Sequence, residues 1–330
     1  MTTLALDFRN QRGGARSGMK RAVDRLSDVR IDATSGLHIG TVRIGEQLLR
    51  VGIRPLPTGE TAATPPLLLF NGIGANLELA APLMARHGAV ESLIFDVPGA
   101  GKSPPPKRPY RLFTMARLAR RLLDHLGYGS VDVMGVSWGG GLAQQFVIQY
   151  PQRVRRLVLA ATAMGGATML PGNPRVLLKM VNPRRYLDKG YMKRVAPELY
   201  GGELRDNPEA IKLFNDHARG GDAKGYRYQL LAMLGWTSLP WLWRIRQPTL
   251  VLAGNDDPLV PLVNARLHTW LLPDARLQVI DDGHLFMLTR ARETARIIGD
   301  FLAETRASQP AAKPAPDPRR WYGRLPPRGP

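Results

Sequence analysis

The feature that most restricts the fold of this chain is the segment Gly135-Val-Ser-Trp-Gly139 with its flanks. An apolar, largely β-branched run, Val131–Val136, comes directly before Ser137, and a helix-forming stretch follows it. A Gly-x-Ser-x-Gly motif between a strand and a helix is typical of a nucleophile elbow, a sharp turn that exposes the serine hydroxyl. The alternative is a glycine-rich turn with an incidental serine. The presence of an acid and a histidine further along the chain would favour the nucleophile.

Two polar residues in the C-terminal part could complete a catalytic triad. His284 is the only one of six histidines that follows the last expected strand, where α/β sheets place ligand-contacting residues. An imidazole is the expected base because it titrates near neutral pH. Asp256 and Asp257 both follow the preceding strand, and Asp257, directly before a proline, is favoured as the acid that orients the imidazole. The order Ser137, Asp257, His284 is that of α/β-hydrolases.

A tetrahedral intermediate also needs hydrogen-bond donors for its negatively charged oxygen. The backbone N–H of Trp138, directly after the serine, is the first expected donor. The second is the backbone N–H of Ile73, in the glycine-rich loop after the apolar run 67–70. Asn71 in the same loop is a candidate substrate-binding residue.

Short apolar runs alternate with helical stretches along most of the chain. The runs are typical of strands buried on both faces of a parallel sheet, and they occur at Leu67–Phe70, Leu93–Phe95, Val131–Val136, Leu157–Leu159, Thr249–Leu252 and Leu277–Ile280. Helices are expected over 113–126, 139–150 and 291–304, and an opening hairpin over Ile39–Ile44 and Gln47–Ile53. This pattern predicts an α/β-hydrolase fold, with a mostly parallel central sheet flanked by helices.

Strand signals are missing between residues 162 and 248, which predicts a mainly helical lid, 164–245, inserted between two parts of the hydrolase core, 36–163 and 246–305. The lid is rich in methionine and tryptophan. Trp236 and Trp241 are candidate substrate-binding residues, although such side chains could equally form the lid's own small core. We expect residues 1–35 to be a basic, weakly ordered extension and the Pro/Arg-rich residues 306–330 to be disordered.

Composition excludes several other classes of protein. The chain contains no cysteine, which excludes disulfides, and no His/Asp/Glu cluster has metal-ligand spacing, so we expect neither a metal nor another cofactor. Asp96–Ser103 lacks the spacing of a phosphate-binding loop. Neither a transmembrane segment nor a secretory signal is expected, which favours a cytoplasmic location. The net charge of +19 is spread along the chain without a nucleic-acid motif, so no specific nucleic-acid binding is expected.

Several segments form a more specific pattern than the hydrolase motif. They are Phe70-Asn-Gly-Ile-Gly-Ala-Asn-Leu-Glu-Leu, Phe95-Asp-Val-Pro-Gly, Gly135-Val-Ser-Trp-Gly-Gly-Gly-Leu-Ala-Gln-Gln-Phe, Leu157-Val-Leu-Ala-Ala-Thr-Ala, Pro183-Arg-Arg-Tyr, Leu234-Gly-Trp-Thr-Ser and Ile280-Asp-Asp-Gly-His-Leu-Phe. Together they resemble intracellular poly(3-hydroxyalkanoate) depolymerases of bacteria, from about residue 38 to 304. The basic extension and the Pro/Arg tail depart from that family's pattern.

The resemblance implies an α/β-hydrolase with Ser137, Asp257 and His284 as its triad and no cofactor. It implies a serine esterase that cleaves a medium-chain polyester, through an acyl-enzyme, to 3-hydroxy acids or oligomers. It also implies that the chain lies on cytoplasmic storage granules, with the hydrophobic polyester surface as its partner. Two alternatives stay open: an α/β-hydrolase that acts on small soluble esters or lactones, and a granule-associated protein without catalytic activity.

Overall fold

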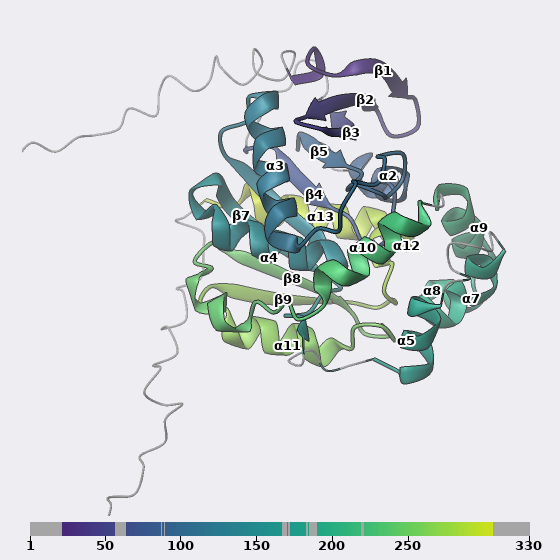
Figure 1. The fold of residues 1–330 in the computed structure, drawn as a ribbon. Coiled ribbons are helices and arrows are strands. Elements are labelled where there is room, and N and C mark those ends of the chain that lie inside the picture. Colours follow the sequence, from purple (N-terminus) through teal and green to yellow (C-terminus); the bar gives the residue numbers. More distant parts are fainter. Residues whose placement is uncertain are drawn as a thin grey trace, which may run out of the picture.

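The computed structural model describes residues 22–56, 64–86, 88, 90–166, 170, 172–182, 184, 190–218 and 221–305. Their strands form one nine-stranded sheet in the order β1-β2-β3-β5-β4-β6-β7-β8-β9 (Figure 1). The strands are β1 (Ser27–Asp32), β2 (Leu37–Ile44), β3 (Gln47–Arg54), β4 (Leu67–Phe70), β5 (Ser92–Phe95), β6 (Val131–Val136), β7 (Val154–Ala160), β8 (Thr249–Gly254) and β9 (Ala275–Ile280). From β5 to β9 all neighbours are parallel, whereas β1, β2 and β3 are antiparallel additions at one edge.

Helices cover both faces of the sheet, and each face has its own hydrophobic core. On one face lie α3 (Leu112–Leu126), α4 (Trp138–Gln149) and α11 (Leu262–Leu271). On the other lie α2 (Leu77–Met84), α12 (Phe286–Thr289) and α13 (Ala291–Ala303). β4 and β6 are buried along their whole length, as expected for strands covered on both faces. The fold class expected from the sequence is therefore confirmed.

The lid, 164–245, lies between β7 and β8 and contains helices but no strand among its described residues. They are α5 (Pro174–Val181), α7 (Tyr191–Tyr200), α8 (Glu203–Asp206), α9 (Pro208–His217), α10 (Ala223–Met233) and the 3-10 helix η4 (Leu239–Arg244). In Figure 1, α5, α7, α8 and α9 form a group beside the sheet. α10 contacts the loop after β4, where the Gln229 side chain accepts a hydrogen bond from the Gly74 N–H, and the Tyr200 carbonyl of α7 accepts one from the N–H of His284 after β9. Lid and core thus meet at the carboxyl ends of the parallel strands, where α/β folds bind ligands.

The expectation of a weakly ordered extension over 1–35 is wrong for its last part. Ser27–Asp32 forms β1, which pairs with β2 through backbone hydrogen bonds, although most of its side chains are exposed. Ala22 and Leu26, directly before β1, are buried in the core and hold the strand in place. Arginine and aspartate in this stretch obscured a strand that depends on backbone pairing at a sheet edge. Residues 1–21 and 306–330 lie outside the described residues.

No helix among the described residues is long and apolar enough to cross a membrane.

Candidate active site

Ser137 stands at the turn between β6 and α4. Its backbone has φ 52° and ψ −117°, a conformation that non-glycine residues rarely adopt and that is typical of functional sites. Two hydrogen bonds hold the turn: the Ser137 N–H donates to the Ala160 carbonyl at 2.9 Å, and the Thr162 hydroxyl donates to the Ser137 carbonyl at 2.7 Å. A Cβ on Gly139 would overlap the carbonyl oxygen of Phe70. The elbow expected from the sequence is therefore present, and the packing explains its glycine.

His284 lies on the loop after β9 and contacts Asp257 from the loop after β8. The distance from His284 Nδ1 to Asp257 Oδ2 is 2.7 Å, and both side chains are buried. The other carboxylate oxygen, Oδ1, accepts hydrogen bonds from the N–H groups of Leu259 and Val260, each at 2.9 Å. The backbone thus fixes one oxygen of Asp257 and leaves the other to orient the imidazole, as a catalytic acid must do.

Asp256, the alternative acid, points away from the imidazole. Its carboxylate accepts hydrogen bonds from Arg205 at 2.8 and 3.0 Å and from the N–H of Gly202 at 2.8 Å. These partners belong to the lid, and about half of the Asp256 side chain is exposed. The geometry therefore favours Asp257 over Asp256, as the sequence predicted.

The lid also contacts the histidine directly. The ring of Tyr200, at the end of α7, stacks on the imidazole of His284 with 6.0 Å between ring centroids and 14° between planes. The Tyr200 carbonyl accepts a hydrogen bond from the His284 N–H at 2.7 Å. Core and lid together therefore set the position of the expected base.

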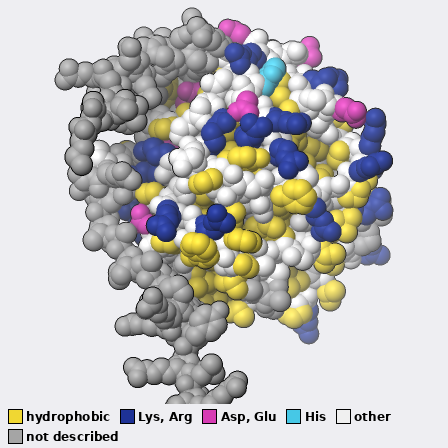
Figure 2. Space-filling model, turned by 60° about the vertical axis from the view of Figure 1, so that its left-hand side comes forward, with side chains coloured by type: hydrophobic (Ala, Val, Ile, Leu, Met, Phe, Trp, Pro, Cys, Tyr) yellow, Lys and Arg dark blue, Asp and Glu magenta, His cyan; other side chains and the backbone are white. Residues whose placement is uncertain are grey.

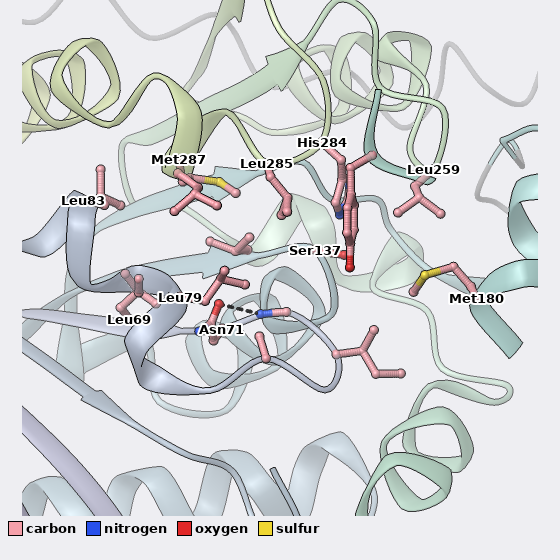
Figure 3. Close-up of a pocket in the computed structure, with 17 residues that line it drawn as sticks. Leu69, Asn71, Leu79, Leu83, Ser137, Met180, Leu259, His284, Leu285 and Met287 are labelled. Atoms are coloured by element: carbon pink, nitrogen blue, oxygen red, sulfur yellow. Dashed lines mark hydrogen bonds between the residues drawn. The ribbon is translucent and has the colours of Figure 1, made fainter. Parts of the chain in front are cut away.

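Ser137 and His284 line the same pocket, where they lie close together (Figure 3). The pocket wall is almost entirely apolar, and it is formed by Leu69, Leu79, Ala80, Leu83, Val136, Leu259, Leu285, Met287 and Leu288 of the core, with Met180 and Tyr200 of the lid. Asn71, Gly72, Ile73 and Ala75 of the loop after β4 complete it. The arrangement can hold an apolar group beside a serine hydroxyl and an imidazole.

The loop after β4 contains the expected donor Ile73, which lines the pocket. The Asn71 side chain organises this loop: its Oδ1 accepts from the Gly72 N–H at 3.0 Å, and its Nδ2 donates to the Asn76 carbonyl at 2.8 Å. Asn71 therefore lines the pocket, while both polar atoms of its amide group form hydrogen bonds within the loop, and its binding of substrate stays a prediction. Trp138, the other expected donor, begins α4, and the first N–H groups of a helix have no acceptor within it.

A buried ionic cluster supports this loop and the start of α2. Arg50 donates to Glu78 at 3.0 Å and to Asp96 at 3.2 Å, and Asp96 accepts the N–H of Leu77 at 2.8 Å. Burial raises the pKa of Asp96 to about 6. Burial opposes ionisation of Glu78 too, but hydrogen bonds from Arg50 and Asn76 outweigh it and lower the pKa of Glu78 to about 2. The Glu78 carboxylate also accepts a hydrogen bond from the Asn76 side chain and thereby holds Asn76 at the end of the loop.

The structure does not bring Trp236 and Trp241 to this pocket. The Trp236 indole donates to Gln145 Oε1 on α4 at 2.7 Å, and the ring packs against the hydrophobic core on the α3 and α4 face of the sheet. Trp241 is 46% exposed, with the Arg244 guanidinium 5.7 Å from its ring centroid. Both residues follow α10, in the part of the chain that leads back to β8, so they come after the lid residues that line the pocket. The lid residues that do line the pocket, Met180 and Tyr200, had no distinguishing signal beyond membership of an apolar lid.

No group of three or more potential metal-ligating side chains occurs within the described part of the chain.

Comparison with known proteins agrees with this geometry. The alpha/beta hydrolase fold family matches residues 65–291. A poly(3-hydroxyalkanoate) depolymerase of Ectopseudomonas oleovorans is 52% identical over 267 residues, which cover 81% of this chain and 93% of that protein. A 3-oxoadipate enol-lactonase of Acinetobacter baylyi is 25% identical, over 68% of this chain and 83% of its own.

Among solved structures, the enol-lactonase of Burkholderia xenovorans LB400 superimposes with a TM-score of 0.70 at 24% identity, covering 80% of this chain and all of that one, which supports the fold alone. The resemblance inferred from the sequence segments is confirmed by the match at 52% identity. The chain therefore belongs to the α/β-hydrolase fold family and, within it, to the family of poly(3-hydroxyalkanoate) depolymerases.

Proposed function

We propose that this chain hydrolyses the ester bonds of poly(3-hydroxyalkanoate) with Ser137 as nucleophile, His284 as base and Asp257 as the orienting acid. The observation that supports this most strongly is the hydrogen bond of 2.7 Å between His284 and Asp257 beside a serine in an elbow, all at one apolar pocket. In a polyester with alkyl side chains, apolar groups surround each ester group, so an apolar pocket suits such a substrate.

The reaction would proceed in two half-steps. In the first half-step, the Ser137 oxygen attacks the ester carbonyl while His284 takes the proton of the Ser137 hydroxyl. Asp257 stabilises the resulting imidazolium. The N–H groups of Ile73 and Trp138 would hold the oxyanion. The intermediate then breaks its bond to the alcohol oxygen, which receives the proton from His284. In the second, water activated by His284 attacks the acyl-enzyme and releases a 3-hydroxy acid or a shorter chain.

The apolar wall supports medium-length alkyl side chains as the preferred substituents. Leu79, Leu83 and Met287 lie on the same side of the pocket in Figure 3, away from Met180. An alkyl group bound there would remain next to Ser137 without meeting a charged side chain. Burial of each methylene group contributes about 0.8 kcal/mol, so a longer substituent gains affinity until the space is filled.

We further propose the surface of a polyester granule as the partner and the place of action. Figure 2 shows Lys and Arg side chains interspersed with hydrophobic ones over one face of the molecule. On α5, Leu178 and Val181 are largely exposed, while Met180 of the same helix lines the pocket. An apolar surface next to the pocket supports contact with an insoluble substrate.

The test is release of 3-hydroxy acids from amorphous medium-chain polyester granules by the wild type and by Ser137→Ala. Release by the wild type alone is expected. A wild type that leaves granules intact but cleaves a soluble aryl ester would retain the triad and refute the polymer as substrate. Equal activity of Ser137→Ala on both substrates would refute the nucleophile. Inactivity of the wild type on both would favour a non-catalytic granule protein.

A further inference from the structure

One lid residue contacts both segments that hold the expected oxyanion donors. Gln229, on α10, is fully buried. Its side-chain Oε1 accepts a hydrogen bond from the Gly74 N–H at 2.8 Å, and its backbone carbonyl accepts one from the Trp138 indole Nε1 at 2.8 Å. Gly74 is the residue after Ile73, so Gln229 bridges the loop after β4 and the elbow at Ser137.

The packing of α10 fixes Gln229 at this place. One turn before Gln229, Gly225 lies so close to Gly99 that a Cβ on either residue would overlap the other's backbone. Next to it, the Tyr226 ring lies against Gly74, where an added Cβ would be 3.0 Å from a ring carbon. Residues four apart on a helix share a face, so Gly225 and Gln229 both point at the core. The packing of α10 therefore holds the Gln229 side chain against the loop after β4.

The orientation of the Gln229 amide follows from its partner. Because the Gly74 N–H is a donor, only the oxygen of the amide can face it. The Nε2 of Gln229 is buried and has no hydrogen-bond partner among the described residues. Most buried side-chain polar atoms form hydrogen bonds, so the Nε2 atom does not explain why a glutamine is buried at this position. The contact of Oε1 with the loop supplies that reason.

We propose that Gln229 is a positioning residue that links lid docking to the oxyanion hole. By holding Gly74 on one side and Trp138 on the other, it sets the spacing of the Ile73 and Trp138 N–H groups, which face the oxyanion in the proposed mechanism. It touches no reacting atom and acts only through these two segments. The inference rests on the proposed function insofar as it assigns the oxyanion to those N–H groups.

The experiment compares Gln229→Met with the wild type on a soluble p-nitrophenyl ester, so that polymer binding does not enter. Methionine keeps the length and burial but removes the acceptor for the Gly74 N–H. Loss of an oxyanion donor typically costs 10²–10³-fold in kcat, and misplacement should cost less. We expect kcat to fall about 10- to 100-fold with KM within about twofold, and the affinity for a boronic acid transition-state analogue to fall in parallel.

Gln144→Met is the matched control, because Gln144 is also fully buried but bonds to the Gly140 and Ala163 carbonyls and to Ser238. It should lower the melting temperature without a selective loss of boronic acid affinity. A merely structural role for Gln229 predicts the same behaviour for both variants. Equal losses in the two variants, or a Gln229→Met variant with wild-type kcat and inhibitor affinity, would overturn the proposal. If the wild type is inactive on this ester, the same comparison of variants is made on amorphous polyester granules, and a wild type inactive on both substrates would instead refute the proposed function.

Gln229→Glu provides a second measurement that does not depend on Gln229→Met folding. It keeps an oxygen acceptor, and burial raises the pKa of a carboxyl group. When ionised, this buried carboxylate would place a negative charge beside the loop that holds the developing oxyanion, which opposes the transition state. As the pH falls, the side chain becomes a neutral acceptor for the Gly74 N–H, as glutamine is. The ratio of kcat for Gln229→Glu to kcat for the wild type should therefore rise at least severalfold from pH 8.5 to pH 6. A kcat for Gln229→Glu at pH 6 that is no higher than that of Gln229→Met, which lacks the acceptor, would contradict the positioning role.

Discussion

The adjacent residues Asp256 and Asp257 allow a controlled test of the triad. The change is Asp257→Asn, which is nearly isosteric. The N–H groups of Leu259 and Val260 donate to Oδ1, so the asparagine oxygen should take that position. The asparagine NH₂ then faces His284 Nδ1, where the carboxylate Oδ2 was 2.7 Å away. Because this NH₂ is a donor, Nδ1 must become an acceptor, and the proton of the neutral ring moves to Nε2.

This tautomer cannot take a proton from Ser137, because the nitrogen facing the serine already holds one. Asparagine also cannot stabilise an imidazolium. In serine proteases the equivalent change lowers kcat about 10⁴-fold, which corresponds to about 5 kcal/mol of transition-state stabilisation. We expect a loss of the same order here. The melting temperature should change little, because both backbone hydrogen bonds remain.

The assay is kcat/KM on a soluble aryl ester, and the matched variant is Asp256→Asn. That change removes a half-exposed ion pair with Arg205, which is worth at most about 1 kcal/mol to stability. We therefore expect its kcat/KM to remain within about threefold of the wild type. A loss of less than tenfold in Asp257→Asn, or a larger loss in Asp256→Asn, would refute the assignment of the acid.

Two further predictions concern the pocket and a buried histidine. Leu79→Phe should fill part of the space beside the apolar wall of the pocket. We expect the ratio of kcat/KM for octanoyl over butanoyl aryl esters to fall about tenfold, since each methylene in such a pocket is worth about 1–3 kcal/mol. An unchanged ratio would place the acyl group elsewhere. Burial lowers the pKa of His268 from 6.5 to about 4. Below pH 6.5 the unfolded chain therefore gains a proton that the folded chain does not, and the wild type should lose about 3 kcal/mol of unfolding free energy by pH 4. Denaturant titrations should show this loss to be absent in His268→Gln, and parallel pH profiles for both proteins would contradict it.

The positions of Ser137, Asp257 and His284 could be predicted from the sequence because each depends on local signals in a fixed chain order. Ser137 lies between a strand and a helix, and His284 and Asp257 follow the last two strands. The loop after β4, with Ile73 at the pocket, could be placed for the same reason. The strands of the sheet set these positions. Continuous apolar runs in the sequence indicate the buried parallel strands clearly.

The lid was predictable as helical but not in its placement. Trp236 is suited to a binding surface by composition, yet it packs against α4, because only the path of the chain between β7 and β8 decides which lid residues meet the pocket. Met180 and Tyr200 reach the pocket from helices with no motif. β1 was missed for a related reason, because its pairing uses backbone groups that carry no side-chain signal.

The contacts between lid and core bear on how the site works. Gly202 of the lid lies against Gly283, directly before His284, so closely that a Cβ on either would overlap backbone atoms. Beside this contact, the N–H of Glu203 donates to the Asp282 side chain at 2.8 Å. These backbone-to-backbone contacts leave no room for a side chain between the lid and the His284 loop. Displacement of this part of the lid would release the histidine loop, and displacement of α10 would release Gly74. Replacing the lid with that of another hydrolase should therefore lower kcat even on small esters, because the exchange removes contacts that support both the His284 loop and the loop after β4.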